Sequence, residues 1–292
     1  MAQYVLENET LVLTINSLGA EMVSLKEKSS EQEYLWNGDE KYWKRSSPVL
    51  FPLVGNYKNK ECIYKGRSYP LSQHGFARDM EFTCISQKEE EIWFSLHETE
   101  ETLQKYPFAF CLEIGYRLFK NQIQVLWKVK NTNKEKMYFS IGGHPAFLCP
   151  LKEGEEQTDY YILFDSEEAL EYALLDENGL KAYEGLKLPL EQGAYRIPAD
   201  MFDKDALIFE DYQVHRVSLL TPQKDPYVTL DFLAPVLGIW SPAGKHAPFV
   251  CIEPWYGRSD AKDFDGTLED RQWGNELEPE EVFEAAYTIT IE

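Results

Sequence analysis

Apolar and polar residues alternate along much of the chain, and this pattern limits the fold more than any other feature. The alternation is clearest at Ile123, Val125 and Trp127, and it extends over residues 82–96 and 108–129. Apolar side chains at every second position are typical of an antiparallel strand that is buried on one face only. No amphipathic helix longer than about three turns is evident. The pattern therefore predicts an all-β protein.

Further short apolar runs bounded by turn residues predict additional strands. They lie at residues 11–15, 19–25, 206–209, 214–219, 227–232, 237–240, 249–252 and 287–291. Lys65-Gly66 and Asn178-Gly179 are residue pairs that favour tight hairpin turns. One short helix is expected over Thr99–Tyr106, with Thr99 as its cap and Pro107 beyond its end.

The segment Tyr42–Asn56 is apolar but contains Pro48 and Pro52, with Arg45 at its entrance. Two prolines suit a buried irregular segment or the edge of a sheet better than a helix. The chain has no Gly/Ser-rich or Pro-rich linker and no internal repeat, so residues 1–292 are expected to form a single domain. Many short strands in one domain predict a β-sandwich or a β-barrel.

The composition excludes several classes of partner. A net charge of −21, spread along the chain, argues against nucleic acid or an anionic membrane. The N-terminus has no basic region followed by an apolar stretch, and no apolar run approaches the roughly 20 residues that span a bilayer. The five cysteines show no CxxC or Cys/His ligand spacing, so reduced thiols are expected and zinc is not. These features together predict a cytoplasmic protein without a metal.

Three short segments combine polar groups with glycine or proline in a way that suggests chemistry. His144 follows two glycines and precedes a proline, His74 stands before Gly75, and Glu253 ends a strongly apolar run. Pro145 biases His144 towards an extended backbone, and Gly142 and Gly143 would let a ligand approach that backbone closely.

Glu253 is a candidate general base, and the alternative is a glutamate at a strand end that faces water. A buried carboxyl group is costly unless it is paired or used, and an apolar environment raises its pKa towards the range of an effective base. The aromatic residues Trp255 and Phe76 are candidates to cover the apolar face of a sugar ring.

With these segments in place, the chain resembles the aldose 1-epimerase (mutarotase) family, in particular its bacterial LacX-like branch. The resemblance spans nearly the whole length and is carried by four segments in the family's order. They are Arg45-Ser-Ser-Pro-Val-Leu-Phe-Pro, His74-Gly-Phe-Ala-Arg, Gly143-His144-Pro-Ala-Phe and Ile252-Glu253-Pro-Trp. Each match is weak by itself, but four in order are specific.

The resemblance implies a large two-sheet antiparallel β-sandwich of the galactose mutarotase-like supersandwich type. It also implies a reaction in which α- and β-anomers of a free sugar interconvert through the open-chain aldehyde. This chemistry needs a base for the C1 hydroxyl and an acid for the ring oxygen. Glu253 suits the base and His144 the acid, with ordinary pKa values of about 4.3 and 6.5 that need only modest upward shifts. Neither a metal nor an organic cofactor is expected.

The family's other site positions are assigned to substrate binding. His74 and Arg45 are expected to hydrogen-bond around the ring oxygen and neighbouring hydroxyls. Asp205 is the expected sugar-binding aspartate, with Asp203 two positions away as the alternative. Arg78 is expected either to contact a sugar or a sugar phosphate, or to pair with Asp79 or another acid in a structural role.

Two further functions stay open from the sequence. One is a mutarotase for hexose 6-phosphates, with Arg45, Arg78 and Lys204 as candidates for the phosphate site. The other is a sugar-binding or sensing protein without turnover. The sequence of the early segment Leu50–Asn56 differs from that of the galactose mutarotases, so the identity of the sugar is not predicted. The sequence does not predict self-association either.

Overall fold

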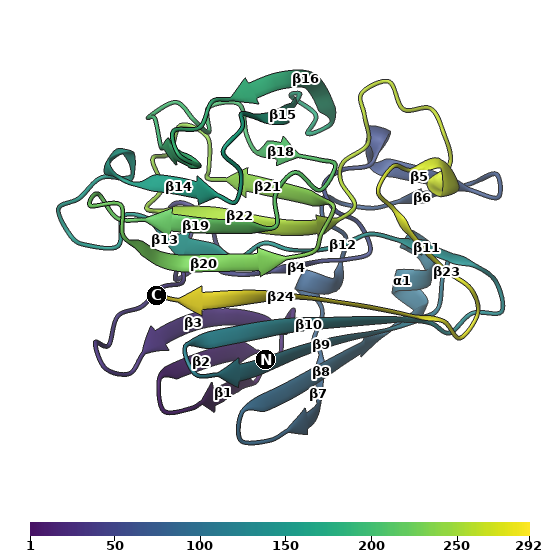
Figure 1. Ribbon diagram of the computed structural model, residues 1–292. Coiled ribbons are helices and arrows are strands. Elements are labelled where there is room, and N and C mark those ends of the chain that lie inside the picture. Colours follow the sequence, from purple (N-terminus) through teal and green to yellow (C-terminus); the bar gives the residue numbers. More distant parts are fainter.

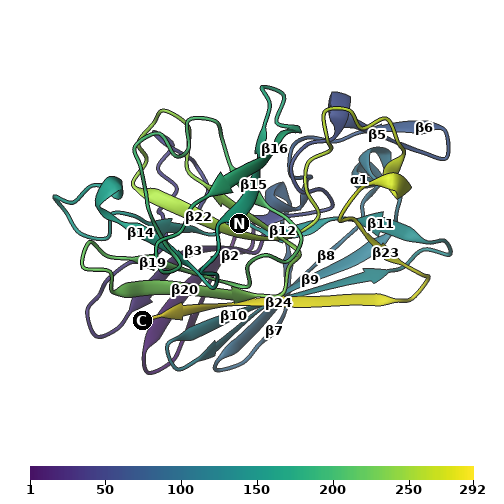
Figure 2. The same cartoon turned by 45° about the horizontal axis from the view of Figure 1, so that its top comes forward.

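The computed structural model describes all 292 residues and consists almost entirely of antiparallel strands in two large sheets, with three smaller ones (Figures 1 and 2). This confirms the predicted all-β, two-sheet class. The only α-helix, α1 (Glu100–Lys105), is one and a half turns long. No helix has the length and apolar character needed to cross a membrane.

The first large sheet has nine strands, several of them long and strictly alternating in burial. In spatial order they are β17 (Ala194–Arg196), β14 (Tyr161–Phe164), β19 (Arg216–Leu220), β20 (Pro226–Phe232), β24 (Val282–Ile291), β10 (Gln122–Asn131), β9 (Phe110–Phe119), β8 (Glu91–His97) and β7 (Thr83–Gln87). In β10, the residues Ile123, Val125 and Trp127 are buried while their neighbours are half-exposed, as the alternation predicts. The C-terminal strand β24 lies in the middle of this sheet, paired with β10 on one side and β20 on the other.

The second large sheet carries the shorter and more deeply buried strands. In spatial order they are β16 (Lys181–Leu188), β15 (Leu170–Leu175), β18 (Leu207–Phe209), β21 (Val236–Trp240), β22 (Phe249–Tyr256), β12 (Ile141–Gly143) and β4 (Val49–Leu50), with β13 (Ala146–Leu148) also paired to β22. One row of directly opposite residues crosses four of these strands: Ala173, Ile208, Gly238 and Glu253. Every second residue of a strand faces the same side, so this row defines the face that carries Glu253.

The remaining elements are small. They are the three-stranded sheet β1 (Gln3–Glu7), β2 (Leu11–Asn16) and β3 (Glu21–Glu27), the pair β5 (Glu61–Tyr64) and β6 (Arg67–Pro70), the pair β11 (Met137–Phe139) and β23 (Asn275–Leu277), and the 3₁₀ helices η1 (Lys58–Lys60), η2 (Ala77–Asp79), η3 (Gln157–Asp159) and η4 (Leu268–Asp270). Both predicted hairpins are confirmed, β5–β6 at Lys65-Gly66 and β15–β16 at Asn178-Gly179. Thr99 caps α1 as predicted, since its side chain accepts a hydrogen bond from the Thr102 amide.

The two large sheets share one core. Phe164 of β14 packs against Phe209 of β18 with ring centroids 5.6 Å apart, and Trp127 of β10 meets Tyr256 of β22 at 6.4 Å. Each contact joins the nine-stranded sheet to the other large sheet. Burying an aromatic side chain of this size contributes about 1.5–3 kcal/mol. The face that carries Glu253 is therefore backed by a packed core.

Candidate functional site

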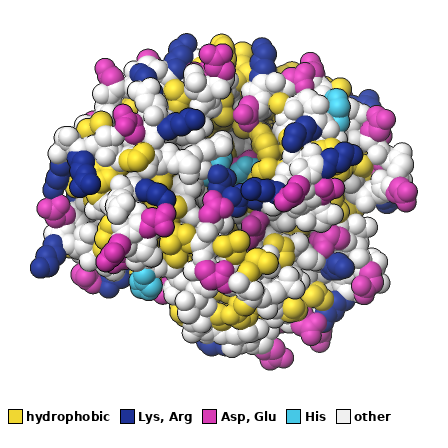
Figure 3. Space-filling model, turned by 180° about the vertical axis from the view of Figure 1, so that it is seen from behind, with side chains coloured by type: hydrophobic (Ala, Val, Ile, Leu, Met, Phe, Trp, Pro, Cys, Tyr) yellow, Lys and Arg dark blue, Asp and Glu magenta, His cyan; other side chains and the backbone are white.

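A cavity of about 300 Å³ lies on the Glu253 face of the second large sheet, where the strands meet the loops that precede β5 and follow β6. Its lining side chains come from segments far apart in the sequence: Trp43, Gly55, Gln73, His74, Arg78, His144, Leu175, Asp205, Ala206, Ile208, Trp240, Glu253, Trp255 and Ser259. Figure 3 shows cyan histidine atoms near the centre of one face of the molecule, bordered by dark-blue Lys and Arg side chains. The cavity brings the three predicted segments together.

His144 and Glu253 lie side by side in the lining of this cavity. Nε2 of His144 lies 3.2 Å from Oε2 of Glu253, and both side chains are buried. Strand β12 pairs with β22 through Gly142 and Trp255, which sets His144 beside Glu253, and the His144 amide donates to the Pro48 carbonyl at 3.1 Å. Residues about 110 positions apart thus meet because their strands are neighbours.

The pair is close but lacks aligned hydrogen bonds. Glu253 Oε2 and His144 Nδ1 are buried without a hydrogen-bond partner in the protein. Buried polar groups in folded proteins almost always have partners, and exceptions often mark catalytic positions. Cys251 adds a thiol to the pair: one ligand atom each from His144, Glu253 and Cys251 lies within 4.8 Å of the others, so these three residues are the group here that could hold a metal ion.

Burial decides the charge state of the pair. It raises the pKa of Glu253 well above its ordinary value, helped by the charge of Asp205. Burial also lowers the pKa of His144 to about 3, and the positive charges of Arg78 and Arg45 add to the effect. The expected modest upward shift is therefore exceeded for Glu253, and the shift of His144 has the opposite sign. Both shifts favour the uncharged forms of the two groups, with the proton on Glu253 rather than on His144.

Two tryptophans that the sequence analysis did not single out hold the His144 ring. Trp43 stacks on it with centroids 4.7 Å apart and planes at 28°, and Trp240 meets it edge-on at 5.3 Å and 82°. Trp43 lies in the apolar segment before β4, and Trp240 ends β21. The sequence carries no motif at either position, because the contact depends on how three segments far apart in the chain pack together. A face-on indole can stabilise a cationic imidazolium.

His74 also lines the cavity, and its ring nitrogens have fixed roles. The residue adopts φ +65°, its amide donates to the Gly55 carbonyl at 2.8 Å, and its Nδ1 accepts from the Gly55 amide at 3.1 Å. Burial, together with the positive charge of Arg78, lowers the pKa of His74 well below its ordinary value. The ring is therefore neutral with its hydrogen on Nε2, so His74 can act only as a donor through that atom.

The two motif arginines are neighbours, but only Arg78 lines the cavity. Nη2 of Arg45 lies 2.6 Å from Oδ1 of Asp79, and its Nη1 donates to the Arg78 carbonyl at 3.4 Å. Nη2 of Arg78 donates to the Gln73 carbonyl at 2.8 Å, while its Nε is buried without a hydrogen-bond partner. Burial and the charge of Arg45 lower the pKa of Arg78 to about 10. Arg45 acts on the site through its charge rather than by lining it.

The structure separates the two candidate aspartates. Asp205 lines the cavity at φ +69°, and its Oδ1 accepts from the Ala206 amide at 2.8 Å. Asp203 and Lys204 are exposed and outside the lining. Asp205 is thus the aspartate in position to meet a ligand.

The aromatic and glycine expectations need correction in part. Trp255 lines the cavity, but Phe76 is a core residue, stacked on Phe110 at 6.0 Å. Gly142 does not leave room for a ligand: a Cβ atom there would lie 2.6 Å from the Trp255 ring, and one at Gly143 would lie 3.0 Å from the Tyr287 hydroxyl. These glycines make room for the protein's own aromatic side chains.

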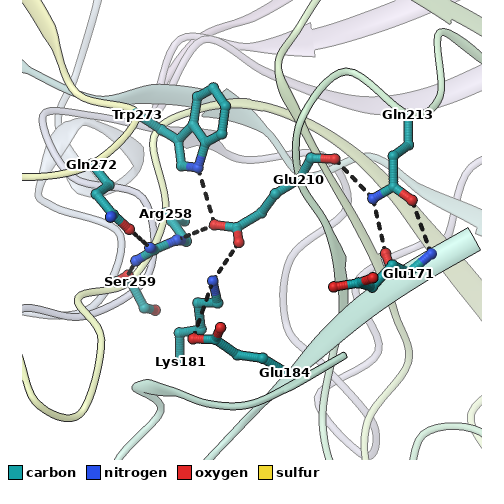
Figure 4. A network of polar contacts seen from close by, with 9 residues as sticks. All are labelled: Glu171, Lys181, Glu184, Glu210, Gln213, Arg258, Ser259, Gln272 and Trp273. Carbon is teal, nitrogen blue, oxygen red and sulfur yellow. Dashed lines mark hydrogen bonds and ion pairs between the residues drawn. The ribbon is translucent and has the colours of Figure 1, made fainter. Parts of the chain in front are cut away.

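A second cavity of about 280 Å³ adjoins the first, because Ile208 lines both. One of its lining residues is Glu210, which forms ion pairs with Lys181 and Arg258 and accepts from Trp273 Nε1 at 3.0 Å (Figure 4). Burial raises the pKa of Glu210, but the hydrogen bonds and charges of Lys181 and Arg258 outweigh it, so the pKa is lowered and the group is ionised. The network anchors the chain after β22 to β18.

The ion-pair network around Glu210 is connected to the first cavity through Ser259. Arg258 is held by Glu210, and the next residue, Ser259, accepts a hydrogen bond from the Asn56 amide at 3.0 Å. Gly55 packs so closely on Ser259 that a Cβ atom would lie 1.9 Å from its hydroxyl oxygen. Since Gly55 also holds His74, the ion network outside the cavity fixes a donor inside it.

Taken together, the cavity offers a proton-sharing carboxyl and imidazole, fixed donors, and indole rings. Such a set can move protons on a neutral polyol without a covalent intermediate.

Comparison with known proteins identifies the family. The sequence profile of the aldose 1-epimerase family matches residues 2–260. The chromosomally encoded protein LacX of Lactococcus lactis subsp. lactis is 33% identical over 98% of both chains. A galactose mutarotase related enzyme from Lactobacillus acidophilus superposes with a TM-score of 0.93 at 35% identity, covering 100% of this chain and 97% of that one. A galactose mutarotase-like protein from Lactobacillus casei gives 0.91 at 28% identity over the whole of both chains. The chain therefore belongs to the aldose 1-epimerase family.

Proposed function

We propose that the protein is an aldose 1-epimerase that interconverts the α- and β-anomers of a hexose or a related aldose. The observation that carries this proposal is the His144–Glu253 pair, whose side chains lie 3.2 Å apart and line a cavity of about 300 Å³. A pure sugar-binding site does not need a matched acid and base. The family membership supports the same reaction class.

Glu253 acts as the base and His144 as the acid. Glu253 removes the proton of the C1 hydroxyl while His144 protonates the ring oxygen, and the ring opens to the aldehyde. Rotation about the C1–C2 bond presents the other face of the carbonyl, and the two groups reverse their roles on closure. The donor Nε2 of His74 and the guanidinium of Arg78 stabilise charge on the sugar oxygens.

Sugar binding must first move the shared proton. Without sugar it sits on Glu253 because of burial. A C1 hydroxyl that donates to Glu253 favours the carboxylate, and a ring oxygen that accepts from His144 favours the imidazolium. The stacked Trp43 ring also favours the cation. The proton then passes from Glu253 to His144 over 3.2 Å.

Replacing either member of the pair tests the proposal. His144→Asn and Glu253→Gln should each lower the rate of mutarotation about 10²–10⁴-fold, as expected for loss of one proton-transfer group. The measurement is polarimetry or NMR anomer exchange on glucose, galactose and other aldoses. His97→Asn, at an exposed histidine outside the cavity, is the matched control. Wild-type rates in both pair variants would sink the assignment, and sugar binding without any acceleration would favour a non-catalytic binder.

A phosphorylated hexose is the second candidate substrate, favoured by one observation. Arg78 lines the cavity with its Nε unpartnered, and the nearest carboxylate, that of Asp79, lies 3.9 Å from that atom. Of the other proposed phosphate ligands, Arg45 is paired with Asp79 and Lys204 lies outside the lining.

The two substrates are distinguished by competition. If the substrate carries a phosphate, a hexose 6-phosphate should compete with the free hexose and be turned over faster. Arg78→Met should then lower the ratio of the two turnover rates at least tenfold. Arg67→Met, at an exposed arginine stacked on Tyr69, is the control. Failure of the phosphate to compete rejects this candidate and leaves the free aldose.

A further inference from the structure

The fold brings together a set of possible metal ligands whose spacing in the sequence matches no metal-binding motif. Cys251 and Glu253 lie two residues apart on β22, and His144 follows the neighbouring strand β12. One ligand atom from each of the three lies within 4.8 Å of the others, and all three residues are buried. The carboxylate atom nearest His144, Oε2 of Glu253, has no hydrogen-bond partner in the protein.

The donor set suits a thiophilic divalent cation. Zinc binds thiolate sulfur at about 2.3 Å, imidazole nitrogen at about 2.0–2.1 Å and carboxylate oxygen at about 2.0–2.2 Å. Two such ligands on a tetrahedral ion are about 3.3–3.7 Å apart. The His144–Glu253 separation of 3.2 Å is already close to this range, so the main movement is an approach of the Cys251 sulfur by up to about 1.5 Å.

The charges and the access route also fit. A thiolate from Cys251 and a carboxylate from Glu253 together balance the charge of +2 on the ion. His144 and Glu253 line the cavity, while Cys251 lies behind them against Ala146 and Phe249. An ion that enters through the cavity meets the imidazole and carboxylate first, and its fourth position faces the cavity.

We propose that His144, Glu253 and Cys251 form a binding site for a thiophilic divalent cation of the zinc type, and that the bound ion blocks the acid–base pair. The ion occupies the lone pairs through which His144 and Glu253 exchange protons with a sugar. The blocking part rests on the proposed function, whereas the binding part does not. The ion is an inhibitor here and takes no part in turnover.

Cobalt(II) is the probe, because a cobalt–thiolate bond gives a charge-transfer absorption band that nitrogen and oxygen ligands do not give. The full-length reduced protein, titrated with CoCl₂, should develop this band at one ion per chain, and ZnCl₂ should displace it. Cys251→Ser should abolish the band, and His144→Asn should weaken cobalt binding at least tenfold. Melting curves of each variant without metal verify that it is folded.

Cys111→Ser is the essential control. Cys111 Sγ lies 3.8 Å from Nε2 of His97 in an exposed position and is the other cysteine paired with a histidine. The band should survive this substitution unchanged. Absence of the band in the wild type, its persistence in Cys251→Ser, or its loss in Cys111→Ser would each overturn the site. If Cys251→Ser does not fold, Cys251→Ala and His144→Asn carry the same test.

Inhibition is measured separately. ZnCl₂ should slow wild-type mutarotation, and EDTA should restore the rate. In Cys251→Ser, with inhibition expressed as a fraction of that variant's own metal-free rate, the zinc concentration for half-inhibition should be at least tenfold higher than in the wild type. A cobalt band without zinc inhibition would overturn the blocking role while leaving the site. A cobalt band in a protein without any mutarotase activity would refute the proposed function and not the metal site.

Discussion

The carboxyl group of Glu253 is almost wholly removed from water, with 1% of its side chain exposed, and its nearest polar neighbour is a neutral imidazole. An environment of this kind disfavours the ionised form and makes the folded state bind a proton more tightly than the unfolded state does. The carboxyl group of Glu253, which the proposed reaction needs, therefore lowers the free energy of unfolding at neutral pH.

Glu253→Gln should accordingly raise the melting temperature at pH 7–8 while removing activity. Each unit by which the folded-state pKa exceeds the unfolded value of about 4.3 costs about 1.4 kcal/mol once the pH is above both. Below pH ~4.3 both states are protonated and the cost vanishes, and it grows as the pH rises towards the raised folded pKa. Differential scanning calorimetry at pH 4 and pH 8 should thus show a gain of a few degrees at pH 8 only. Glu40→Gln, at an exposed glutamate, should show neither effect. An equal gain at both pH values would contradict the argument.

Residue-level signals explain which parts of the site were predictable. A glycine or proline stands directly beside each of His144, His74 and Glu253, at the end of an apolar run. Such neighbours can be recognised from the sequence alone. Trp43, Trp240 and Cys251 have no such neighbours. Their roles arise from packing between strands, which one sequence does not specify.

At the scale of elements, the loops before β5 and after β6 are locked together by glycines in left-handed conformation. Gly75 has φ +72°, and a Cβ atom there would lie 2.2 Å from the Phe51 carbonyl oxygen. This close approach is what lets the amide of the neighbouring Phe76 reach the same oxygen at 3.1 Å.

Gly75→Ala and Gly66→Ala separate backbone strain from crowding. Gly66 has nearly the same φ, +74°, but nothing lies within 4 Å of its Cβ position. Gly66→Ala should cost about 1–2 kcal/mol, the price of a left-handed alanine. Gly75→Ala should cost several kcal/mol, since the backbone must also move. Urea unfolding gives both values, and equal losses would show that the contact with Phe51 is unimportant.

The strands themselves were largely predictable, and the order of the strands in the sheets was not. Alternation in β10 and turn residues between β5 and β6 are local properties of the sequence. Strand β24 pairs with β10 across more than 150 residues of chain and with β20 across more than 50. For pairings at such separations the sequence offers only apolar periodicity.

At the scale of the whole molecule, β24 joins the two halves of the nine-stranded sheet. Deleting residues 282–292 should therefore abolish cooperative folding, because both β10 and β20 lose a partner and Ile289 and Ile291 leave the core. Circular dichroism melting of the deletion variant checks this, with deletion of Glu292 alone as the control. A sharp thermal transition in the longer deletion would contradict it.

The shared side chain of Ile208 has a practical consequence for redesign. It lines both cavities, which have volumes of about 300 and 280 Å³, and its neighbours in the row across the sheet are Ala173 and Gly238. Replacing this one residue with alanine should remove side-chain volume between the two cavities and leave the proton-transfer groups in place. An engineer who wants the scaffold to accept a sugar with a bulky substituent would begin there.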